Sequence, residues 1–315
     1  MAVVTVEEAL QLWDEALQTQ VHKVETIDVK AAKGYVLAED IIAPTDVPAF
    51  PKSAMDGYAI TYKADCNEYI VDGIIGAGVV WEHSVETGHA VRIMTGAPVP
   101  DTCDTVIMQE QVVGSGEPGT TITIQGKYTC GDHIIPQGEE CSAGTTVIPR
   151  GTEVTSTVQT ILTGLGFTEI TVNEMPRVLV LTSGHEVIEP GESLTPGKIY
   201  NSNRAMICGL LEDLGFHKIT HYHVSDAPEE LESEINHVLQ LSEDADIIIS
   251  SGGVSVGLFD TMPLIYEKLG AQSIYERIQM RPGAASYGAV TPKGQIIFGL
   301  SGNPGAAFNG WHLIV

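Results

Sequence analysis

The octet SSGGVSVG (residues 250–257) decides how the second half of this 315-residue chain folds. It follows the apolar run 247–249, and a short apolar run that opens into a glycine-rich turn is typical of a buried parallel strand. Glycines let the amides of such a turn curl around an anion, and a helix beginning near Pro263 would add its positive end. Asp260 follows closely, and a carboxylate beside a bound phosphate indicates a bridging Mg²⁺. The stretch predicts either a phosphate or oxyanion site, or a tight strand-to-helix turn without a ligand.

Strands and helices alternate from Pro176 onward. The expected strands lie at 178–182, 217–224, 246–250 and 295–300, and the expected helices at 203–214, 228–241 and 263–269. This alternation predicts a doubly wound, mostly parallel sheet, which binds ligands at the carboxyl ends of its strands. Turns rich in small or acidic residues fall at those ends, at 183–186, 225–226, 250–257 and 301–305. One rim of the sheet is therefore the predicted ligand site.

The first half of the chain has a different pattern. Thr5 and Glu8 form a capping box before an amphipathic helix, and a second helical stretch at 155–165 is expected to pack on that helix. In between, glycine and proline become frequent and separate short β-branched runs at 73–80, 90–93, 105–108 and 120–124. Short strands divided by turn residues are typical of an all-β module.

These patterns predict a multidomain protein of the α/β plus β class. The predicted domains are a small helical linking domain (1–45 and 147–175), an inserted all-β module (46–146) and an α/β domain (176–315).

Composition limits the partners. The chain has 41 acidic and 16 basic residues, and its net charge of −25 repels nucleic acids and anionic membranes. Its 5 cysteines are scattered without a CxxC pair, as expected for reduced thiols and not for disulfides or a zinc site. No apolar run approaches the roughly 18 residues of a membrane span, and the N-terminus lacks a signal peptide's basic region. We expect a soluble, cytoplasmic protein that binds small anions through local amides, a metal ion and a few cations.

Several motifs in a fixed order resemble the molybdopterin molybdenumtransferases, that is, the MoeA proteins and the related gephyrin E domain. They are PKSAMDGYAI (51–60), IMTGAPVPDTCDTVIMQE (93–110), LTSGHEVIEPG (181–191), GKIYNSN (197–203), SSGGVSVG with Asp260, RPG (281–283) and GLSGNPGAAF (299–308). The resemblance implies Mg²⁺-dependent insertion of molybdate into adenylylated molybdopterin, with release of AMP. It also implies a homodimer whose active cleft combines the MogA-like α/β domain of one subunit with the β module of the other, and a MogA-type adenylyltransferase as a partner.

The resemblance also assigns catalytic residues. Asp226 and Asp260 match the family's acidic positions and are expected to hold Mg²⁺, although Asp226 would also suit a helix N-cap. Glu186 would orient the substrate or a metal-bound water, or else cap a helix or turn. In the β module, Asp56 would reach the partner's substrate or act as a simple turn residue. Thr95 supplies a hydroxyl suited to an oxyanion such as molybdate.

The remaining assignments are substrate contacts. Arg277 and Arg281 fall where the family carries lysines, and strand spacing places both on one face, where they could reach one anion or lie exposed on an edge strand. Near Thr95, Gly96 and Ala97 would offer free amides to an oxyanion. The full predicted set is Ser53, Gly96, Ala97, Ser251, Gly252, Gly253, Ser255, Arg277, Arg281, Pro282, Ser301, Gly302, Asn303 and Pro304.

The chain departs from the family pattern at three motif positions. His185 replaces the acid of TGDE, Ala284 replaces a lysine of KPGKP, and Ser301 replaces a proline of GLPGNP. A lost charge-assisted contact to phosphate weakens binding by about 1.5–3 kcal/mol. His185 could ligate a metal or serve as a hydrogen-bonded cap, and the pair His221 and His223 favours a structural role.

Two other functions stay open at this point. One is a non-catalytic paralogue that binds molybdopterin or molybdate. The other is a CinA-like nucleotide hydrolase on the same α/β module, which the β-module motifs disfavour. The last residues, 311–315, fall within an expected amphipathic helix, whereas relatives continue into another small β-rich domain. An exposed apolar helix end would indicate that the chain is cut there.

Overall fold

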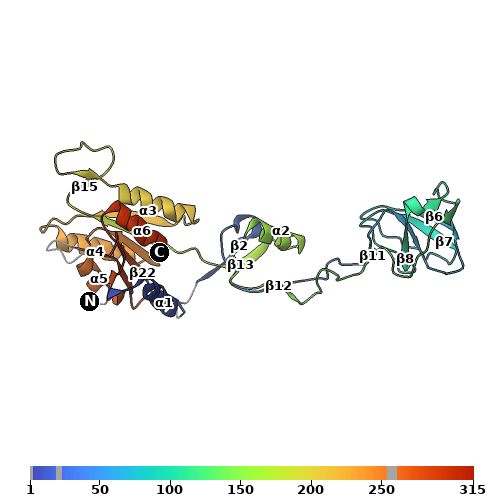
Figure 1. Ribbon diagram of the computed structural model, residues 1–315, viewed down its shortest axis with the longest axis horizontal. Helices are drawn as coiled ribbons and strands as arrows, with labels where there is room; N and C mark the ends of the chain where they lie inside the picture. Colours follow the sequence, from blue (N-terminus) through green and yellow to red (C-terminus); the bar gives the residue numbers. More distant parts are fainter. Residues whose placement is uncertain (1–2, 19–22, 254–260) are drawn as a thin grey trace. The chain divides into compact units, whose positions relative to one another are not determined.

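The computed structural model describes residues 3–18, 23–253 and 261–315 (Figure 1). The predicted site residues Ser255 and Asp260 lie outside these residues. The chain divides into two compact units, which we call unit 1 (Met1–Glu25 with Val172–Val315) and unit 2 (Thr26–Thr171). The three-domain division stays a prediction, and each unit is described by itself.

Unit 1 is built on a six-stranded sheet with the order β17-β14-β18-β22-β21-β19. The first four strands are mutually parallel, and β21 and β19 extend the sheet antiparallel. The mostly parallel sheet predicted from the alternating pattern is thus confirmed. The strands are β17 (Ile219–Val224), β14 (Val178–Ser183), β18 (Ile247–Ser251), β22 (Ile296–Leu300), β21 (Tyr287–Val290) and β19 (Gln272–Tyr275).

Helices cover both faces of this sheet (Figure 1). Val178 and Val180 of β14 pack with α3 (Ser202–Asp213) and α6 (Pro304–Ile314) on one face. Leu179 and Leu181 pack with α4 (Leu231–Ser242) and α5 (Met262–Lys268) on the other. Because successive strand residues point to opposite faces, a strand buried at every position needs cover on both sides. The apolar run of β14 therefore explains the doubly wound arrangement.

The first helix, α1 (Val6–Leu17), begins at the predicted capping box. The Glu8 amide donates to Thr5 Oγ1 at 3.1 Å, and the Thr5 amide donates to Glu8 Oε2 at 2.8 Å. Its buried residues Ala9 and Trp13 pack on Tyr275 and its neighbours within unit 1. The expectation that α1 packs on the helical stretch near 155–165 is therefore wrong. Helical periodicity identifies a buried face but not what covers it.

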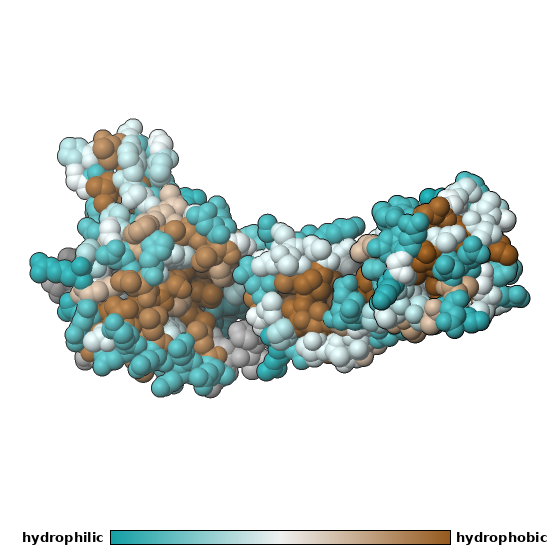
Figure 2. All heavy atoms as spheres, turned by 45° about the vertical axis from the view of Figure 1, so that its right-hand side comes forward, coloured by the Kyte–Doolittle hydropathy of each residue, from teal (hydrophilic) through white to brown (hydrophobic). Residues whose placement is uncertain are grey.

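Unit 1 is completed by α6 and two short strand pairs. On α6, Trp311 and Ile314 are buried, while Phe308 and Leu313 are 46% and 44% exposed, so the expected exposed apolar helix end is present only in part. Apolar residues also form part of the visible surface of each unit (Figure 2). The short pairs are parallel: β1 (Val3–Val4) with β20 (Arg277–Ile278), and β15 (Val187–Ile188) with β16 (Ile199–Tyr200).

Unit 2 holds a six-stranded sheet with the order β8-β5-β7-β6-β10-β9, in which only β6 and β7 pair in parallel. The runs near 90–93, 105–108 and 120–124 form strands as predicted, but β6 ends at Ile75, and Val79 and Val80 are exposed. The strands are β8 (Thr105–Met108), β5 (Gly57–Ile60), β7 (His89–Ile93), β6 (Glu68–Ile75), β10 (Thr121–Ile124) and β9 (Val112–Val113).

Smaller elements complete unit 2 and the segments where the chain passes between the units. One α-helix, α2 (Ser156–Gly164), buries Val158 and Leu162. The strand pairs are β2 (Val24–Asp28) with β13 (Glu169–Asn173), β3 (Ile41–Ile42) with β12 (Thr146–Ile148), and β4 (Lys52–Ser53) with β11 (Ile134–Ile135). Short 3-10 turns span Val29–Ala31 and Gln109–Gln111. In the described parts of both units, no helix has the length and apolarity needed to cross a membrane.

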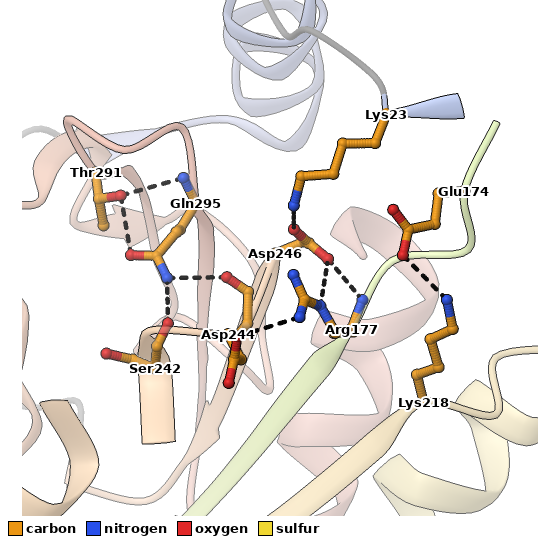
Figure 3. A network of polar contacts seen from close by, with 10 residues as sticks. Lys23, Glu174, Arg177, Lys218, Ser242, Asp244, Asp246, Thr291 and Gln295 are labelled. Carbon is orange, nitrogen blue, oxygen red and sulfur yellow. Dashed lines mark hydrogen bonds and ion pairs between the residues drawn. The ribbon is translucent and has the colours of Figure 1, made fainter. Parts of the chain in front are cut away.

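A network of ion pairs and hydrogen bonds closes the amino ends of β14, β18 and β22 (Figure 3). Asp246 accepts from the Arg177 amide at 2.9 Å and from Lys23 Nζ at 3.2 Å. Burial alone would raise the pKa of Asp246. Hydrogen bonds from Arg177 and Lys23, together with the positive charges of these residues, outweigh burial, so the pKa of Asp246 is lowered. Gln295 Nε2 donates to the carbonyl oxygens of Ser242 at 2.5 Å and Ala245 at 2.9 Å. This end of the sheet is held by paired polar groups.

Candidate functional site

A pocket of about 260 Å³ lies at the carboxyl ends of β14, β18 and β22. It is lined by the turns after these strands, by the start of α3, and by Asp226 and Ala285. We call it the rim pocket. It lies at the predicted edge of the sheet, where the strands of an open α/β sheet end and ligands bind.

The rim pocket brings together most of the predicted residues of unit 1. Eight of them line it: Glu186, Asp226, Ser251, Gly252, Gly253, Ser301, Gly302 and Pro304. Arg277 and Arg281 instead line a separate groove of about 430 Å³, where both are exposed. Pro282 follows Arg281 and is exposed as well. The two arginines thus share one surface, as their spacing predicts, but that surface is not the rim pocket.

Asp226 is held at the pocket by one of its two carboxylate oxygens. Its Oδ2 accepts a hydrogen bond from the His185 amide at 3.2 Å. Its Oδ1 is buried and has no hydrogen-bond partner among the described residues. The alternative role as a helix N-cap is wrong, because α4 begins only at Leu231, with Glu230 at the N-cap. His185 and Glu186 are both exposed.

Glycines let the turn after β18 press against the end of β14. Gly252 has a φ of +88°, and a Cβ there would lie 2.5 Å from the carbonyl oxygen of Ser183. Gly253 has a φ of +60°, and its Cβ would lie 2.7 Å from Ser183 Oγ. A side chain at either position would therefore clash and strain the backbone. The glycines of the SSGG motif are required by this close approach.

Asn203 is a site residue that the sequence analysis did not single out. It lies in the first turn of α3, where its Nδ2 donates to Ser251 Oγ and to the Gly302 carbonyl oxygen, both at 2.8 Å. Ser251 Oγ in turn donates to the Ser301 carbonyl oxygen at 3.0 Å. Asn203 thus joins α3 to the turns after β18 and β22. The available signal was the polar NSN triplet immediately before an apolar helical pattern.

Two helices begin at the rim pocket with asparagine caps. Asn201 accepts from the Arg204 amide at the start of α3, and Asn303 accepts from the Ala306 amide at the start of α6, each at 3.1 Å. The side chain of Asn303, predicted as a substrate contact, therefore serves as a cap. Unsatisfied amides and the dipole make a helix N-terminus favourable for an anion. Their placement offers positive potential in a strongly acidic chain.

In unit 2, the structure brings together the predicted pair Asp56 and Thr95. The Thr95 amide and Oγ1 both donate to Asp56 Oδ1, at 2.7 and 2.8 Å. These hydrogen bonds, the backbone one first, lower the pKa of Asp56. Both residues are exposed. The pair therefore presents an ionised carboxylate in a fixed orientation.

The expectation of free amides next to Thr95 is wrong. The Gly96 amide donates to the Ser53 carbonyl oxygen at 2.8 Å, and the Ala97 amide donates to the Met94 carbonyl oxygen at 3.0 Å. Ser53 is fully buried, and its Oγ donates to the Met55 carbonyl oxygen at 2.6 Å. Ser53, Gly96 and Ala97 therefore form the frame of the turn that holds Asp56 and Thr95. Their amides are occupied by the protein itself.

Side chains that could ligate a metal do not cluster among the described residues. Within residues 3–18, 23–253 and 261–315, no group of three or more His, Cys, Asp or Glu side chains is arranged to hold a metal ion. Asp226 is the predicted metal ligand that the structure describes.

Comparisons with known proteins cover almost the whole chain. Residues 4–166 match the model of the MoeA N-terminal region (domain I and II), and residues 179–315 match that of a probable molybdopterin binding domain. Molybdopterin molybdenumtransferases of Staphylococcus epidermidis and Staphylococcus aureus are 38% identical over 300 residues and 37% identical over 298. Each alignment covers 92% of this chain and 69% of the relative. A crystal structure of the molybdopterin biosynthesis MoeA protein from Pyrococcus horikoshii matches with a TM-score of 0.80 and 26% identity, over 99% of this chain and 77% of that one.

Proposed function

The chain belongs to the molybdopterin molybdenumtransferase family, and we propose that the rim pocket of unit 1 is where it holds molybdopterin. Its function is the insertion of molybdenum into molybdopterin in the biosynthesis of the molybdenum cofactor. The family predicted from the motifs is confirmed. The alternatives of a non-catalytic paralogue and of a CinA-like hydrolase are not favoured.

Buried oxygens without partners carry the proposal for the rim pocket. Among the described residues, Ser183 Oγ, Asn203 Oδ1 and Asp226 Oδ1 are buried and unpaired, and all three residues line the pocket. An unsatisfied buried polar group costs about 1–3 kcal/mol. A ligand that offers N–H donors, as a pterin ring does, supplies the missing hydrogen bonds to these oxygens and so removes the cost. The two helix N-termini suit the phosphate part of the same ligand.

Mg²⁺ is proposed as the cofactor, with adenylylated molybdopterin and molybdate as substrates. Asp226 Oδ1 is a hard, ionisable oxygen donor without a partner among the described residues, which fits the oxygen ligation that Mg²⁺ requires. Asp260 is proposed as the second ligand, although its position lies outside the described residues. When bound, Mg²⁺ would neutralise the pyrophosphate charge that develops as AMP leaves. Asp226 would hold the ion, and its hydrogen bond from the His185 amide would fix the carboxylate.

A homodimer is proposed to complete the site. Asp56 is exposed, and two hydrogen bonds from Thr95 that both fall on Oδ1 hold its carboxylate in one orientation. We propose that this pair acts on the substrate held by the other subunit, where Asp56 orients molybdate or water. Glu186, exposed at the rim pocket, is proposed to assist from the same side as Asp226. A MogA-type adenylyltransferase in the cytoplasm is proposed to supply the adenylylated substrate.

The test of the proposed function is molybdate-dependent AMP release. The purified protein is mixed with adenylylated molybdopterin, molybdate and Mg²⁺, and AMP is followed by chromatography. Asp226→Asn keeps the size of the side chain but removes its charge, and we expect a loss of about 100-fold, the scale of a lost charge-assisted contact. Asp213→Asn, at the exposed end of α3, is the matched control and should keep full activity. If the wild type binds the substrate but releases no AMP, the chain is a binding protein and the proposal fails.

The shared site is tested by mixing inactive variants. Asp226→Asn and Asp56→Asn are each expected to be inactive as homodimers. In a shared site, the mixed dimer has one intact site, so about a quarter of the wild-type activity should return after subunit exchange. No recovery in a sample that sedimentation shows to contain mixed dimers would place all catalytic residues within one subunit.

A further inference from the structure

One buried hydroxyl, that of Thr182 in the wall of the rim pocket, is shared by three nitrogens. Thr182 Oγ1 lies 3.0 Å from Asn201 Nδ2, 3.0 Å from His221 Nε2 and 3.1 Å from His223 Nδ1. Thr182 is only 2% exposed. In the parallel register of β14 and β17, Thr182 lies opposite His223 and Val180 opposite His221. Both rings therefore reach one hydroxyl from the neighbouring strand.

The count of hydrogens fixes how these contacts are arranged. A threonine hydroxyl donates one hydrogen and accepts up to two. Asn201 Nδ2 can only donate. All three contacts are satisfied only if one ring nitrogen donates to Thr182 Oγ1 and the other accepts its hydrogen. At least one histidine must therefore be neutral for the arrangement to hold.

The surroundings of His221 keep that ring neutral. Burial and the charge of Arg204 on α3 lower its pKa to about 4, His223 on its own strand acts in the same direction, and Glu189 after β15 opposes them. At neutral pH the ring carries no charge, and one of its nitrogens is able to accept. The neutral ring of His221 is the state that the hydrogen bonds around Thr182 Oγ1 require of at least one histidine.

The hydroxyl is connected to the start of α3 through Asn201, and Thr182 and Asn201 both line the rim pocket. Asn201 is 4% exposed, and its Nδ2 also donates to Glu189 Oε1 at 2.9 Å. Its Oδ1 caps α3, as described above. Arg204 Nη1 donates to Glu189 Oε2 at 2.7 Å and braces the same turn. Two residues further along the helix, Asn203 makes the contacts to Ser251 and Gly302 that shape the rim pocket.

We propose that Thr182, oriented by His221 and His223, is a positioning residue for the reaction: it fixes Asn201, and through it the first turn of α3 that presents Asn203 to the substrate. Thr182 does not act on the reacting atoms. This role rests on the proposed function of the rim pocket. It gives the two histidines, for which strand spacing predicted a structural role, a part in substrate binding.

The test compares Thr182→Val, which keeps the shape without the hydroxyl, with Thr182→Ser, which keeps the hydroxyl. Equilibrium binding of adenylylated molybdopterin is followed by pterin fluorescence, and KM and kcat by molybdate-dependent AMP release. We expect Thr182→Val to raise Kd and KM about tenfold with kcat within about twofold, because a positioning contact acts on binding. Thr182→Ser should stay within about twofold of the wild type in all three.

A destabilised control separates positioning from a general loss of stability. Val180→Ala, two residues earlier on β14, removes core contacts without touching the hydroxyl network, and should lower the Tm but leave Kd unchanged. Should Thr182→Val not fold, Asn201→Ser replaces it: it keeps a capping hydroxyl but is too short to reach Thr182, and the same rise in Kd is expected.

The outcomes are distinct. Thr182→Val with wild-type Kd and KM, or Thr182→Ser as impaired as Thr182→Val, overturns the positioning role while the proposed function stands. A wild type that neither binds the substrate nor releases AMP refutes the proposed function instead. The positioning role is then decided by a crystal structure of Thr182→Val: displaced Asn201 and Asn203 side chains support it, and unmoved ones overturn it.

Discussion

The two ends of the unit 1 sheet differ in whether their buried polar groups have hydrogen-bond partners. At the carboxyl end, three residues of the rim pocket carry buried oxygens that lack partners among the described residues. At the amino end, the network around Asp246, Arg177 and Gln295 pairs its charges and amides with one another (Figure 3). Buried polar groups that are paired support the fold, and those left unpaired are available to a ligand.

Pocket size does not distinguish these ends. A hollow of about 380 Å³ lies at the amino end, next to Arg177, Asp246 and Gln295, and is larger than the rim pocket of about 260 Å³. Within the described chain, none of the residues lining the amino-end hollow has a buried, unpaired side-chain nitrogen or oxygen. The two ends therefore differ in unmet hydrogen-bonding capacity, which is found at the proposed binding end although its pocket is the smaller one.

The largest effect on stability is expected at the amino end, from Gln295→Leu. Gln295 is 6% exposed, and its Nε2 donates to the carbonyl oxygens of Ser242 and Ala245. Its loss removes both hydrogen bonds and leaves the Ser242 carbonyl oxygen only the Ala245 amide, at 3.1 Å. We expect the free energy of unfolding to fall by about 3 kcal/mol, measured by urea denaturation. Gln240→Leu, the same change at an exposed position of α4, is the control. Equal stability of the two variants would break the comparison at this end.

A change of opposite sign is expected at the carboxyl end, from Ser183→Ala. The variant removes a buried hydroxyl that has no partner among the described residues, so the free energy of unfolding should rise by about 1 kcal/mol. Binding of adenylylated molybdopterin should weaken about tenfold, because the hydroxyl is then missing from the site. Urea denaturation and pterin fluorescence measure the two effects. A variant that is less stable yet binds normally would show that Ser183 supports the fold and not the ligand.

The smallest expected effect is on the pH dependence of stability, which should differ between His221 near the rim pocket and Asp246 at the amino end. The pKa of His221 is about 4 in the folded protein and 6.5 when unperturbed. Between pH 4 and pH 6.5 only the unfolded chain binds a proton at this histidine. The stability that the neutral His221 ring contributes is therefore complete above pH 6.5 and is lost as the pH falls towards 4. Asp246, whose pKa is lowered from 3.8, loses its contribution only below that range.

Unfolding free energies at about pH 7.5 and about pH 4.5 test this order. His221→Gln should flatten the wild-type decline by on the order of 1 kcal/mol, once solvent screening of a half-buried ring is allowed for. Asp246→Asn should leave that decline unchanged over the same interval. The opposite pattern would mean that the amino-end network, and not His221, sets the acid sensitivity.

Much of unit 1 was predictable from the sequence. The apolar runs that became β14, β18 and β22 have a length typical of buried strands, and the SSGG glycines indicated the turn that packs on Ser183. The antiparallel edge of β21 and β19 was not predicted. Edge strands are short and mixed in composition, and their direction depends on non-local pairing.

The candidate site was predictable in its location more than in its contacts. Asp226 was placed at the rim correctly, since strand ends define that rim. The occupied amides of Gly96 and Ala97 were missed because their acceptors, Ser53 and Met94, follow from the path of the turn and not from residue type. Asn203 and Thr182 were missed because they act through neighbouring side chains, which no spacing rule reveals.

The crossing between the units has a consequence for how such proteins diversify. The chain leaves unit 1 after Glu25 and returns at Val172, and the Glu174 amide donates to the Lys23 carbonyl oxygen at 2.8 Å. The two ends of the interruption are therefore next to each other at the base of the sheet. An insertion into residues 26–171, or an exchange of this segment, would therefore leave every strand of the unit 1 sheet beside the same neighbours.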